Sequence, residues 1–385
     1  MSSDRSVSRR YILDTFAAIC FGVLPIHAQA QQPLELEIMG HTRIRIQEKQ
    51  AMDWFKRITG FTESTYTATR AQLQVHGATL RSKANGRSYG IGAFEMASLA
   101  DLRARVAEGT GAKGTARISI VQGDVREMHQ ATEYAGALFQ VASQFNALEM
   151  VDPSVTPDDG VTNYEHDRTQ GPACAIAAGA ATIWRNYFAP VGDQIGQTAT
   201  RQLDGLVDLG AELSARLGCP VADLWEWRNG YALCTQPGLD LIADHLRAIG
   251  PKQADALASK LRVGIHRDVE VTDAPSAPGP MVSQAFCSAL PVAYGRVPPQ
   301  HWAAFAQLVL DAAYEATMLE AVLNARRGVS NIVLLTMLGG GAFGNAPEWI
   351  HAAIKRAMKL AQDFDLDVRL VSYGPPSMEV RELVK

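Results

Sequence analysis

The sequence lacks most of the features that mark metal, nucleic-acid or membrane proteins. Only five cysteines occur in 385 residues, and no two form a CxxC pair, so we expect no zinc site. The formal net charge is -4, so no overall positive charge attracts nucleic acid or an anionic membrane. Beyond the N-terminus, no segment approaches the roughly 18 uninterrupted apolar residues of a membrane span. We therefore expect no metal, no cofactor, no nucleic-acid partner and no stable membrane span.

The composition itself is that of a globular protein with ample material for a core. Hydrophobic residues make up 47% of the chain and charged residues 20%, which suits one large domain or two small ones. If Cys20 is removed with a signal, four cysteines remain, and disulfides are permitted but not implied. Their neighbours are mostly apolar, which favours buried free thiols.

The first thirty residues have the layout of an export signal. Ser8-Arg9-Arg10-Tyr11-Ile12-Leu13 resembles a twin-arginine motif, an apolar stretch follows, and Ala28-Gln29-Ala30 supplies a small-residue end. This predicts a signal at residues 1–30 and a periplasmic or secreted protein. Because Asp14 and Pro25 interrupt the apolar stretch, an amphipathic helix of a cytoplasmic protein stays open as the alternative.

The next segment, residues 31–116, has the pattern of a small α+β accessory unit. Two strand-like stretches flank KANGR, which predicts a hairpin. The following SLADLRARVAEG begins with a serine N-cap, Ser98, and ends on Gly109, which predicts a helix.

From Arg117 to the C-terminus, apolar strand patterns alternate with helical ones. This alternation predicts an α/β domain at 117–385, with a parallel or mixed sheet covered on both faces. Strands are expected in RISIVQGDV, GALFQVAS, LRVGIHRDVEV, SQAFCSALPVAY and DVRLVSYG. Helical patterns interrupt this alternation at about residues 193–260, which indicates a helical insertion.

A glycine-rich stretch near the C-terminus points to a ligand. Asn331–Leu338 is an apolar run of strand length, Gly339–Asn345 reads GGGAFGN, and a helical pattern starts at Pro347. Glycines leave backbone N–H groups unshielded, and a helix start favours negative charge, so the unit suits a phosphate. A tight turn without a ligand is the alternative.

Three other loops follow strands or precede a helix, where ligands of α/β sheets gather. They are Gly123-Asp124, Ala142–Asn146 and the helix start at Gly171-Pro172. In their order along the chain, VQGDV, VASQFNALE and GGGAFGN resemble motifs of the macrodomain family, which binds ADP-ribose. The GGGAFGN loop is most similar to the poly(ADP-ribose) glycohydrolase-like branch, and the resemblance covers roughly residues 117–374.

The resemblance implies a macrodomain-like three-layer α/β/α sandwich with a mixed sheet, and it implies ligand contacts. Asp124 would accept a hydrogen bond from the adenine amino group, Asn146 would contact the distal ribose, and Phe343 would stack on a ribose. For each of these residues a turn, cap or core role is the alternative. The implied ADP-ribose-binding residues are Asp124, Asn146, Gly171, Ala173, Gly339, Gly340, Gly341, Ala342, Phe343, Gly344 and Asn345.

The sequence departs from the family where a first glycine-rich phosphate loop is usual. PDDGVTNYEHDRTQGPACA stands there, without the tandem glycine-glutamate-glutamate motif. The overlapping stretch YEHDRTQGPACAIAAGAATIWRNYF is similar to a divergent branch known from a bacterial effector that removes ADP-ribose from arginine. Hydrolysis of an N-glycosidic bond needs a carboxylate that activates water and further negative charge near the leaving group. Asp167 and Asp159 are the first candidates and Glu165 the next, with loop solvation and N-capping as the alternative.

The predicted function is therefore an ADP-ribosylhydrolase, with arginine-linked ADP-ribose as the expected substrate. Its partner would be ADP-ribose or an ADP-ribosylated protein, and the sequence indicates no oligomeric state. A module that reads ADP-ribose without cutting it is the main alternative. A nucleotide-sugar or phosphoester enzyme on a Rossmann-like sheet ranks last, because GGGAFGN lacks the G-x-G-x-x-G spacing.

Overall fold

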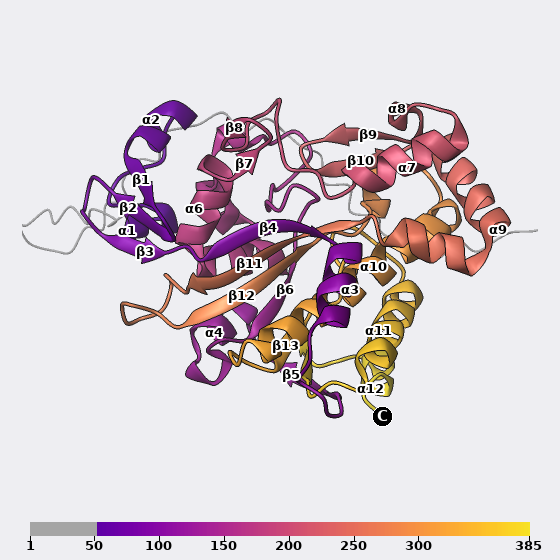
Figure 1. Cartoon of the computed structure of the whole chain (residues 1–385). Helices are drawn as coiled ribbons and strands as arrows, with labels where there is room; N and C mark the ends of the chain where they lie inside the picture. The colour runs from indigo at the N-terminus through magenta and orange to yellow at the C-terminus, as the bar shows by residue number, and fades with distance from the viewer. Residues whose placement is uncertain (1–51) are drawn as a thin grey trace, which may run out of the picture. The chain divides into compact units, whose positions relative to one another are not determined.

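The computed structural model describes residues 52–385 (Figure 1). The predicted export signal at 1–30 and the predicted accessory segment up to residue 51 lie outside these residues. Within the described part, no helix is both long enough and apolar enough to cross a bilayer.

Helices and strands alternate along most of the described chain. The helices are α1 (Trp54–Thr59), α2 (Tyr66–Ala71), α3 (Leu99–Glu108), α4 (Val125–Gln130), α5 (Gln170–Ala177), α6 (Gly179–Tyr187), α7 (Val207–Leu217), α8 (Val221–Leu224), α9 (Gln236–Ala258), α10 (Pro299–Arg326), α11 (Pro347–Ala361) and α12 (Met378–Glu382). The strands are β1 (Leu73–His76), β2 (Thr79–Ser82), β3 (Ser88–Gly90), β4 (Ala93–Ser98), β5 (Arg117–Gln122), β6 (Leu138–Ala142), β7 (Pro190–Val191), β8 (Gln194–Ile195), β9 (Trp225–Arg228), β10 (Tyr231–Cys234), β11 (Arg262–Glu270), β12 (Met281–Cys287), β13 (Ile332–Leu335) and β14 (Asp367–Ser372).

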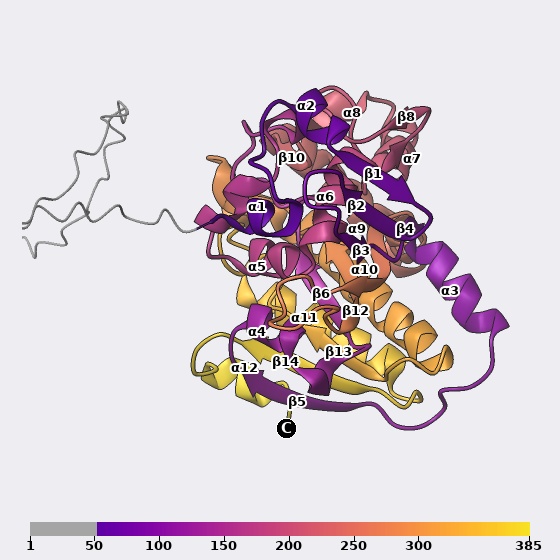
Figure 2. The same cartoon turned by 90° about the vertical axis from the view of Figure 1, so that its left-hand side faces the viewer.

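The main sheet has seven strands in the order β4-β11-β12-β6-β13-β14-β5. Strands β12, β6, β13, β14 and β5 run parallel to one another, whereas β11 is antiparallel to both β4 and β12. Figure 2 shows β5 at the outer edge, beside β14. The sheet is therefore mixed, and the carboxyl ends of its parallel strands meet at one edge.

Successive side chains of the central strands enter different cores. Leu138, Val333 and Leu335 belong to the core that α10 and α11 share, whereas Phe139 and Leu334 belong to the core that includes α4 and α5. Because neighbouring strand residues point to opposite faces, a continuous apolar strand is buried on both sides. Helices cover both faces of the sheet (Figure 1), which confirms the predicted three-layer α/β/α sandwich.

The segment before Arg117 divides between two parts of the fold. β2 pairs antiparallel with β3 around KANGR, as predicted, and Ser98 caps α3 in a capping box with Asp101. However, β4 pairs with β11 in the main sheet and α3 packs on α10. β4 and α3, which the sequence grouped with the accessory segment at 31–116, thus lie in the layers of the main domain.

The helix expected from the start at Gly171-Pro172 is followed directly by a second helix in the structure. The stretch GPACAIAAGAATIWRNYF forms α5 and α6, which are separated at Ala178 by a non-helical φ of -103° and ψ of 51°. Gly179, directly after the break, lies against α1, since a Cβ there would be 2.5 Å from Ile58 Cδ1. The break therefore lets α6 approach α1 closely.

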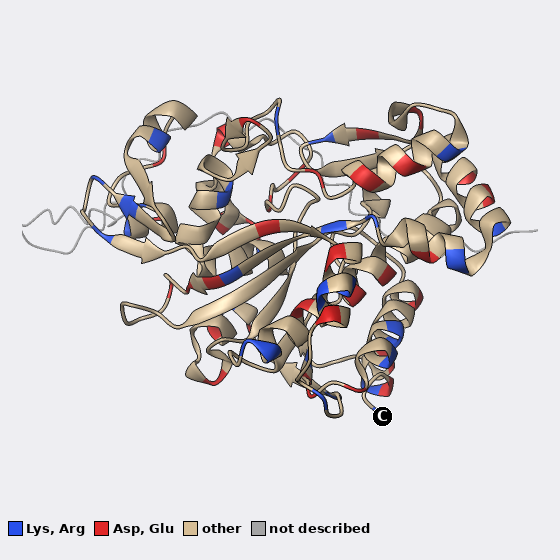
Figure 3. Cartoon of the chain, viewed as in Figure 1, with Lys and Arg blue, Asp and Glu red and all other residues tan. Residues whose placement is uncertain are grey.

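The predicted helical insertion is present, and it contains a hairpin that the sequence analysis missed. Strands β9 and β10 pair antiparallel around Asn229-Gly230, whose φ angles are 47° and 82°. Positive φ at both central residues is the requirement of the type I′ turn, for which Asn-Gly is a preferred dipeptide. Acidic and basic residues are interspersed along α9 (Figure 3).

Candidate active site

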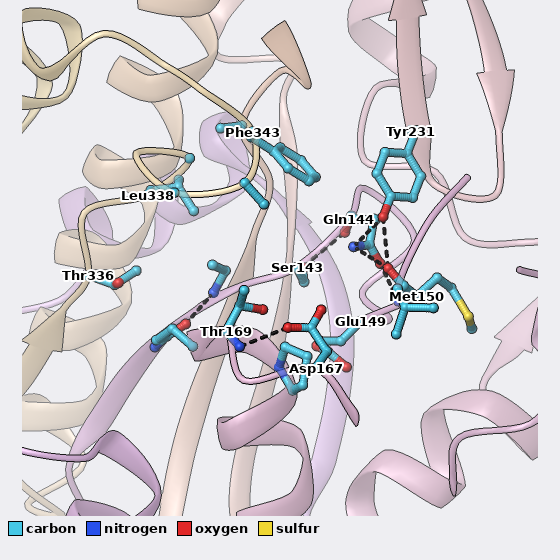
Figure 4. Close-up of a pocket in the computed structure, with 18 of the residues that line it drawn as sticks. Ser143, Gln144, Glu149, Met150, Asp167, Thr169, Tyr231, Thr336, Leu338 and Phe343 are labelled. Carbon is cyan, nitrogen blue, oxygen red and sulfur yellow. Dashed lines mark hydrogen bonds between the residues drawn. The ribbon is translucent and has the colours of Figure 1, made fainter. Parts of the chain in front are cut away.

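A cavity of about 290 Å³ lies at the carboxyl ends of β6, β12 and β13. Its wall comes from the loop after β6, the segment leading into α5, the loop after β13 and the β9–β10 hairpin (Figure 4). This is the edge of an α/β sheet where ligands bind. The segments that the sequence singled out as ligand-binding loops thus supply much of one cavity.

The glycine loop between β13 and α11 is held in shape by its own backbone. Asn345 N–H donates to Gly339 O at 2.9 Å, and Gly344 N–H donates to Gly341 O at 3.0 Å. The Asn345 side chain donates to Leu290 O at 2.8 Å. Gly339 is required here, because its φ is 74° and a Cβ would lie 2.5 Å from Ala289.

Part of this loop offers hydrogen-bond donors without partners. Gly339, Gly341, Ala342 and Phe343 line the cavity, whereas Gly340, Gly344 and Asn345 do not. Within residues 52–385, the backbone N–H groups of 341, 342 and 343 donate to no protein acceptor. The described cavity wall contains no Lys, Arg or His. An anion in this cavity would therefore be bound by backbone N–H groups.

Of the three predicted catalytic carboxylates, only Asp167 lines the cavity. It follows the short 3₁₀ helix η3 (Thr162–His166), and its side chain accepts a hydrogen bond from Thr169 N–H at 2.8 Å. This bond fixes the carboxylate at the entrance to α5. Nearby, the Gln170 side chain accepts from Ala142 N–H at 2.8 Å and donates to Gln140 O at 2.8 Å, which ties the start of α5 to the end of β6.

The other two predicted catalytic residues lie outside the cavity wall. Asp159 accepts hydrogen bonds from Thr156 N–H and Oγ1, both at 2.8 Å, in a capping box of a 3₁₀ turn. Glu165 is exposed, and its carboxylate lies 3.9 Å from His166 Nε2. The capping alternative thus describes Asp159, because a short turn with Thr at its start recruits a carboxylate three residues later.

A buried carboxyl group that the sequence analysis did not select also lines the cavity. Glu149 follows the loop after β6, and its side chain is almost fully buried. Burial raises its pKa to about 8, although the nearby Arg185 opposes this rise. Figure 4 draws Glu149 and Asp167 on one side of the cavity and Phe343 and Leu338 on the other. The sequence signal that could have identified Glu149 was an acidic residue between Leu148 and Met150, in an otherwise apolar stretch.

Arg185 of α6 is the fully buried cation beside Glu149. Its Nη2 lies 3.6 Å from Glu149 Oε2, which is an ion-pair distance but too long for a hydrogen bond. Its Nε donates to Ala147 O at 3.0 Å and its Nη2 to Thr182 Oγ1 at 3.0 Å. Its guanidinium carbon lies 3.8 Å from the Phe286 ring centroid. These contacts hold the guanidinium in one orientation behind the cavity.

Three aromatic rings form another part of the wall. Phe343 of the glycine loop lies 5.6 Å from Tyr231 of β10 and 5.4 Å from Tyr294, measured between ring centroids. The Tyr231 hydroxyl donates to Met150 O at 2.7 Å and accepts from Gln144 Nε2 at 3.2 Å. Tyr231 reaches the cavity on the β9–β10 hairpin. The Asn-Gly turn was therefore the sequence signal for this wall.

Two of the predicted ligand-binding residues make hydrogen bonds within the protein. Asp124 caps α4 by accepting from Arg126 N–H at 2.8 Å, and it follows β5, which β14 separates from β13. Asn146 is buried; its Nδ2 donates to Gln202 Oε1 at 2.9 Å, and its Oδ1 accepts from Leu148 N–H at 3.1 Å. Neither residue lines the cavity.

The two predicted N–H donors at the start of α5, Gly171 and Ala173, pack within the protein. Gly171 is pressed onto β6, because a Cβ there would lie 1.9 Å from Ala142 O. Ala173 N–H donates to Thr169 O at 3.3 Å, so this donor is used within the helix. The cavity is lined instead by their neighbours Gln170 and Pro172. Gly171 thus permits close helix–strand packing.

The described part of the chain shows no metal-binding cluster and no disulfide. No group of three His, Cys, Asp or Glu side chains within residues 52–385 is placed to hold a metal ion. Cys174, Cys219, Cys234 and Cys287 form no disulfide in this part of the structure.

Comparisons with known proteins give only distant likenesses. No protein-family model matches the chain, and no curated protein sequence matches it. A solved poly(ADP-ribose) glycohydrolase from Thermomonospora curvata is similar with a TM-score of 0.40 and 13% identity, covering 83% of this chain and 96% of that one. Poly(ADP-ribose) glycohydrolase from Deinococcus radiodurans, solved in complex with ADP-ribose, gives a TM-score of 0.39 and 12% identity over 76% of this chain and 92% of that one. These values are too low to transfer an activity.

Proposed function

We propose that the protein is a glycosidic hydrolase that removes ADP-ribose from modified arginine side chains. One observation carries this proposal: a single cavity combines the carboxylate of Asp167 with a glycine loop whose N–H groups at 341–343 have no protein acceptor. A phosphate needs such donors, and attack of water on a ribose needs such a carboxylate. The sequence resemblance to the macrodomain family supports the same ligand.

In the proposed reaction, a water oxygen attacks the ribose carbon that is bonded to the guanidino nitrogen. The new C–O bond forms as the C–N bond breaks, and its electron pair leaves on the nitrogen. Asp167 accepts a proton from the water, and the leaving guanidine takes up a proton from solvent. Asp167 then returns its proton to solvent, so no net proton is consumed.

The size of the cavity limits how much of the ligand it holds. Its volume of about 290 Å³ is just below the roughly 300–1,000 Å³ that small-molecule sites span. It would therefore hold the distal ribose and its phosphate, with the adenine outside. The glycine loop would take the phosphate, and the wall with Asp167 would take the ribose.

The chemistry of the wall supports arginine as the leaving group. Asp167 offers negative charge, and Tyr231, Tyr294 and Phe343 offer aromatic faces. A guanidinium is attracted by both, and the described wall has no cationic side chain that would repel it.

The deciding experiment measures release of ADP-ribose from three proteins modified on arginine, glutamate or serine, beside calorimetry with free ADP-ribose. We expect binding of ADP-ribose and release from the arginine-modified protein. Binding without release from any of the three would favour a reader module. No detectable heat up to millimolar ADP-ribose would contradict both functions.

We also propose that the protein is exported, on the basis of the twin-arginine-like residues Arg9 and Arg10. Residues 1–32 fused to a reporter that works only after folded export should give a signal in a bacterial host. Changing both arginines to lysine should abolish this signal. Reporter activity that survives the double change would argue against the twin-arginine route.

A further inference from the structure

Glu149 is a buried carboxyl group in the cavity wall whose hydrogen bonds are not made within the protein. Its residue is 1% exposed, and no group in residues 52–385 donates a hydrogen bond to either carboxyl oxygen. Almost all buried polar groups in proteins have a partner, and each exception calls for a physical reason. A carboxyl group at the wall of a ligand cavity suggests that the ligand is the missing donor.

The surrounding groups do not fill this role. Arg185, from α6, is the charged neighbour, but its Nη2 stays 3.6 Å from Glu149 Oε2 while its donors serve Ala147 O and Thr182 Oγ1. The Tyr164 hydroxyl, from η3, accepts from Glu149 N–H at 3.1 Å but makes no hydrogen bond to the Glu149 carboxyl oxygens.

The other titratable groups near Glu149 are neutral or lie in the cavity itself. Burial raises the pKa of the Tyr164 hydroxyl and of the Cys174 thiol of α5 well above their ordinary values. His266 lies behind Arg185, and burial holds its pKa well below the ordinary value. Asp167 lines the same cavity. Among the elements packed around Glu149, α6 thus supplies the facing cation, Arg185.

We propose that Glu149 is a further ligand-binding residue of this cavity: its carboxylate accepts hydrogen bonds from hydroxyl groups of the bound ribose, and the protein releases a proton when they form. This inference rests on the proposed function, since it takes the distal ribose of ADP-ribose as the occupant. The proton passes from the Glu149 carboxyl to solvent, and no other group is oxidised, reduced or transferred.

The direction of proton movement follows from the surroundings of Glu149 in the free protein and in the ligand-bound protein. In the free protein, burial raises the pKa of Glu149 to about 8, so the group is mainly protonated at pH 7. Hydroxyl donors at both oxygens replace the hydrogen bonds that water would supply and favour the charged form. The Arg185 guanidinium also favours this form. Binding should therefore lower the pKa and release a proton.

The experiment is calorimetric titration of the wild-type protein with ADP-ribose in buffers of different ionisation enthalpy. At pH 7 we expect release of more than half a proton per ligand, and at pH 9 much less, because Glu149 is then already ionised. ADP, which lacks the distal ribose, serves as the matched ligand and should release no proton from this group. Equal heats in all buffers at pH 7, with ADP-ribose bound, would overturn the inference alone.

A variant provides the second measurement. Glu149→Gln keeps the shape but cannot ionise, so its affinity for ADP-ribose should fall at least tenfold and its proton release should vanish. Glu226→Gln, at an exposed position of β9, is the matched control and should behave as wild type. If Glu149→Gln fails to fold, the wild-type buffer comparison still decides. Failure of wild type to bind ADP-ribose would sink this inference and the proposed function together.

Discussion

The carbonyl oxygen of Gly230 accepts a hydrogen bond from the Phe145 N–H at 3.0 Å. This bond joins the turn of the inserted β9–β10 hairpin to the loop that follows β6. Further bonds strengthen the junction: Gln202 Nε2 donates to Asn229 Oδ1 at 2.8 Å, and Asn229 Nδ2 donates to Pro153 O at 2.8 Å. The insertion is therefore part of the cavity, and it holds Tyr231 in the wall.

Replacing Gly230 by alanine should destabilise the fold and disturb the cavity. Its φ is 82°, and a Cβ would lie 2.6 Å from the Asn146 side chain. Gly218→Ala is the matched control, because its φ is also positive, 68°, but a Cβ there meets nothing within 4 Å. We expect about 1–2 kcal/mol of destabilisation for the control and about 1–3 kcal/mol more for Gly230→Ala, measured by denaturant unfolding. Equal losses would mean that the hairpin does not press on Asn146.

Replacing Gly341 by valine should weaken ligand binding while the fold is kept. A Cβ at this position meets no atom within 4 Å, so the side chain occupies open space beside the unpartnered N–H groups. Affinity for ADP-ribose should fall at least tenfold, about 1.4 kcal/mol, with the melting temperature nearly unchanged. Gly374→Val, where a Cβ also meets nothing and the residue does not line the cavity, is the control. Normal binding by Gly341→Val would show that the loop is only a turn.

Replacing Asp167 by asparagine tests the proposed chemistry. The amide keeps the acceptor for Thr169 N–H but cannot take a proton from water, so release of ADP-ribose should slow by a factor on the order of 10² to 10⁴. Binding of free ADP-ribose should change little. Asp363→Asn, at an exposed position, controls for the loss of a charge. Undiminished turnover in Asp167→Asn would move the catalytic carboxylate elsewhere.

A variant of Asp159 tests which role this residue has: the catalytic role predicted from the sequence, or the capping role seen in the structure. Because its carboxylate caps Thr156 outside the cavity wall, Asp159→Ala should cost about 0.5–2 kcal/mol of unfolding free energy. Turnover at a temperature where the variant is folded should stay within a few-fold of wild type. A hundredfold loss of turnover with stability retained would restore the catalytic assignment.

Asp204 makes stability depend on pH. Burial raises its pKa from 3.8 to about 6, although its hydrogen bond from Leu206 N–H opposes the rise. The native state therefore binds more protons than the unfolded state between these values, so this contribution is present below pH 4 and is lost as pH rises through 6. Asp204→Asn removes this loss, so it should be more stable than wild type by about 3 kcal/mol above pH 7 and by little below pH 4.

The measurement is denaturant unfolding of both proteins across this pH range, with Asp363→Asn as an exposed control. A stability difference that does not grow between pH 4 and pH 7 would contradict the raised pKa of Asp204.

The sequence by itself determined the elements and the class of fold. The strand pattern, the Ser98 cap, the KANGR hairpin and the strand–glycine–helix unit at 331–358 depend on local periodicity and turn chemistry, and the structure has all of them. The same local rule covers the Asn229-Gly230 hairpin, which was overlooked although its signal was present.

Only the tertiary structure decided which polar groups share the cavity. Asp159 and Asp167 are aspartates close together in sequence, yet one caps a turn and the other lines the cavity, because a carboxylate's role depends on the donors that the fold brings to it. The Asn146 side chain donates a hydrogen bond to Gln202 of the insertion, which lies more than fifty positions away in the sequence. Glu149 is buried in the cavity wall beside Arg185 of α6, which lies more than thirty positions later in the sequence. Burial and pairing of this kind are properties of the packed chain.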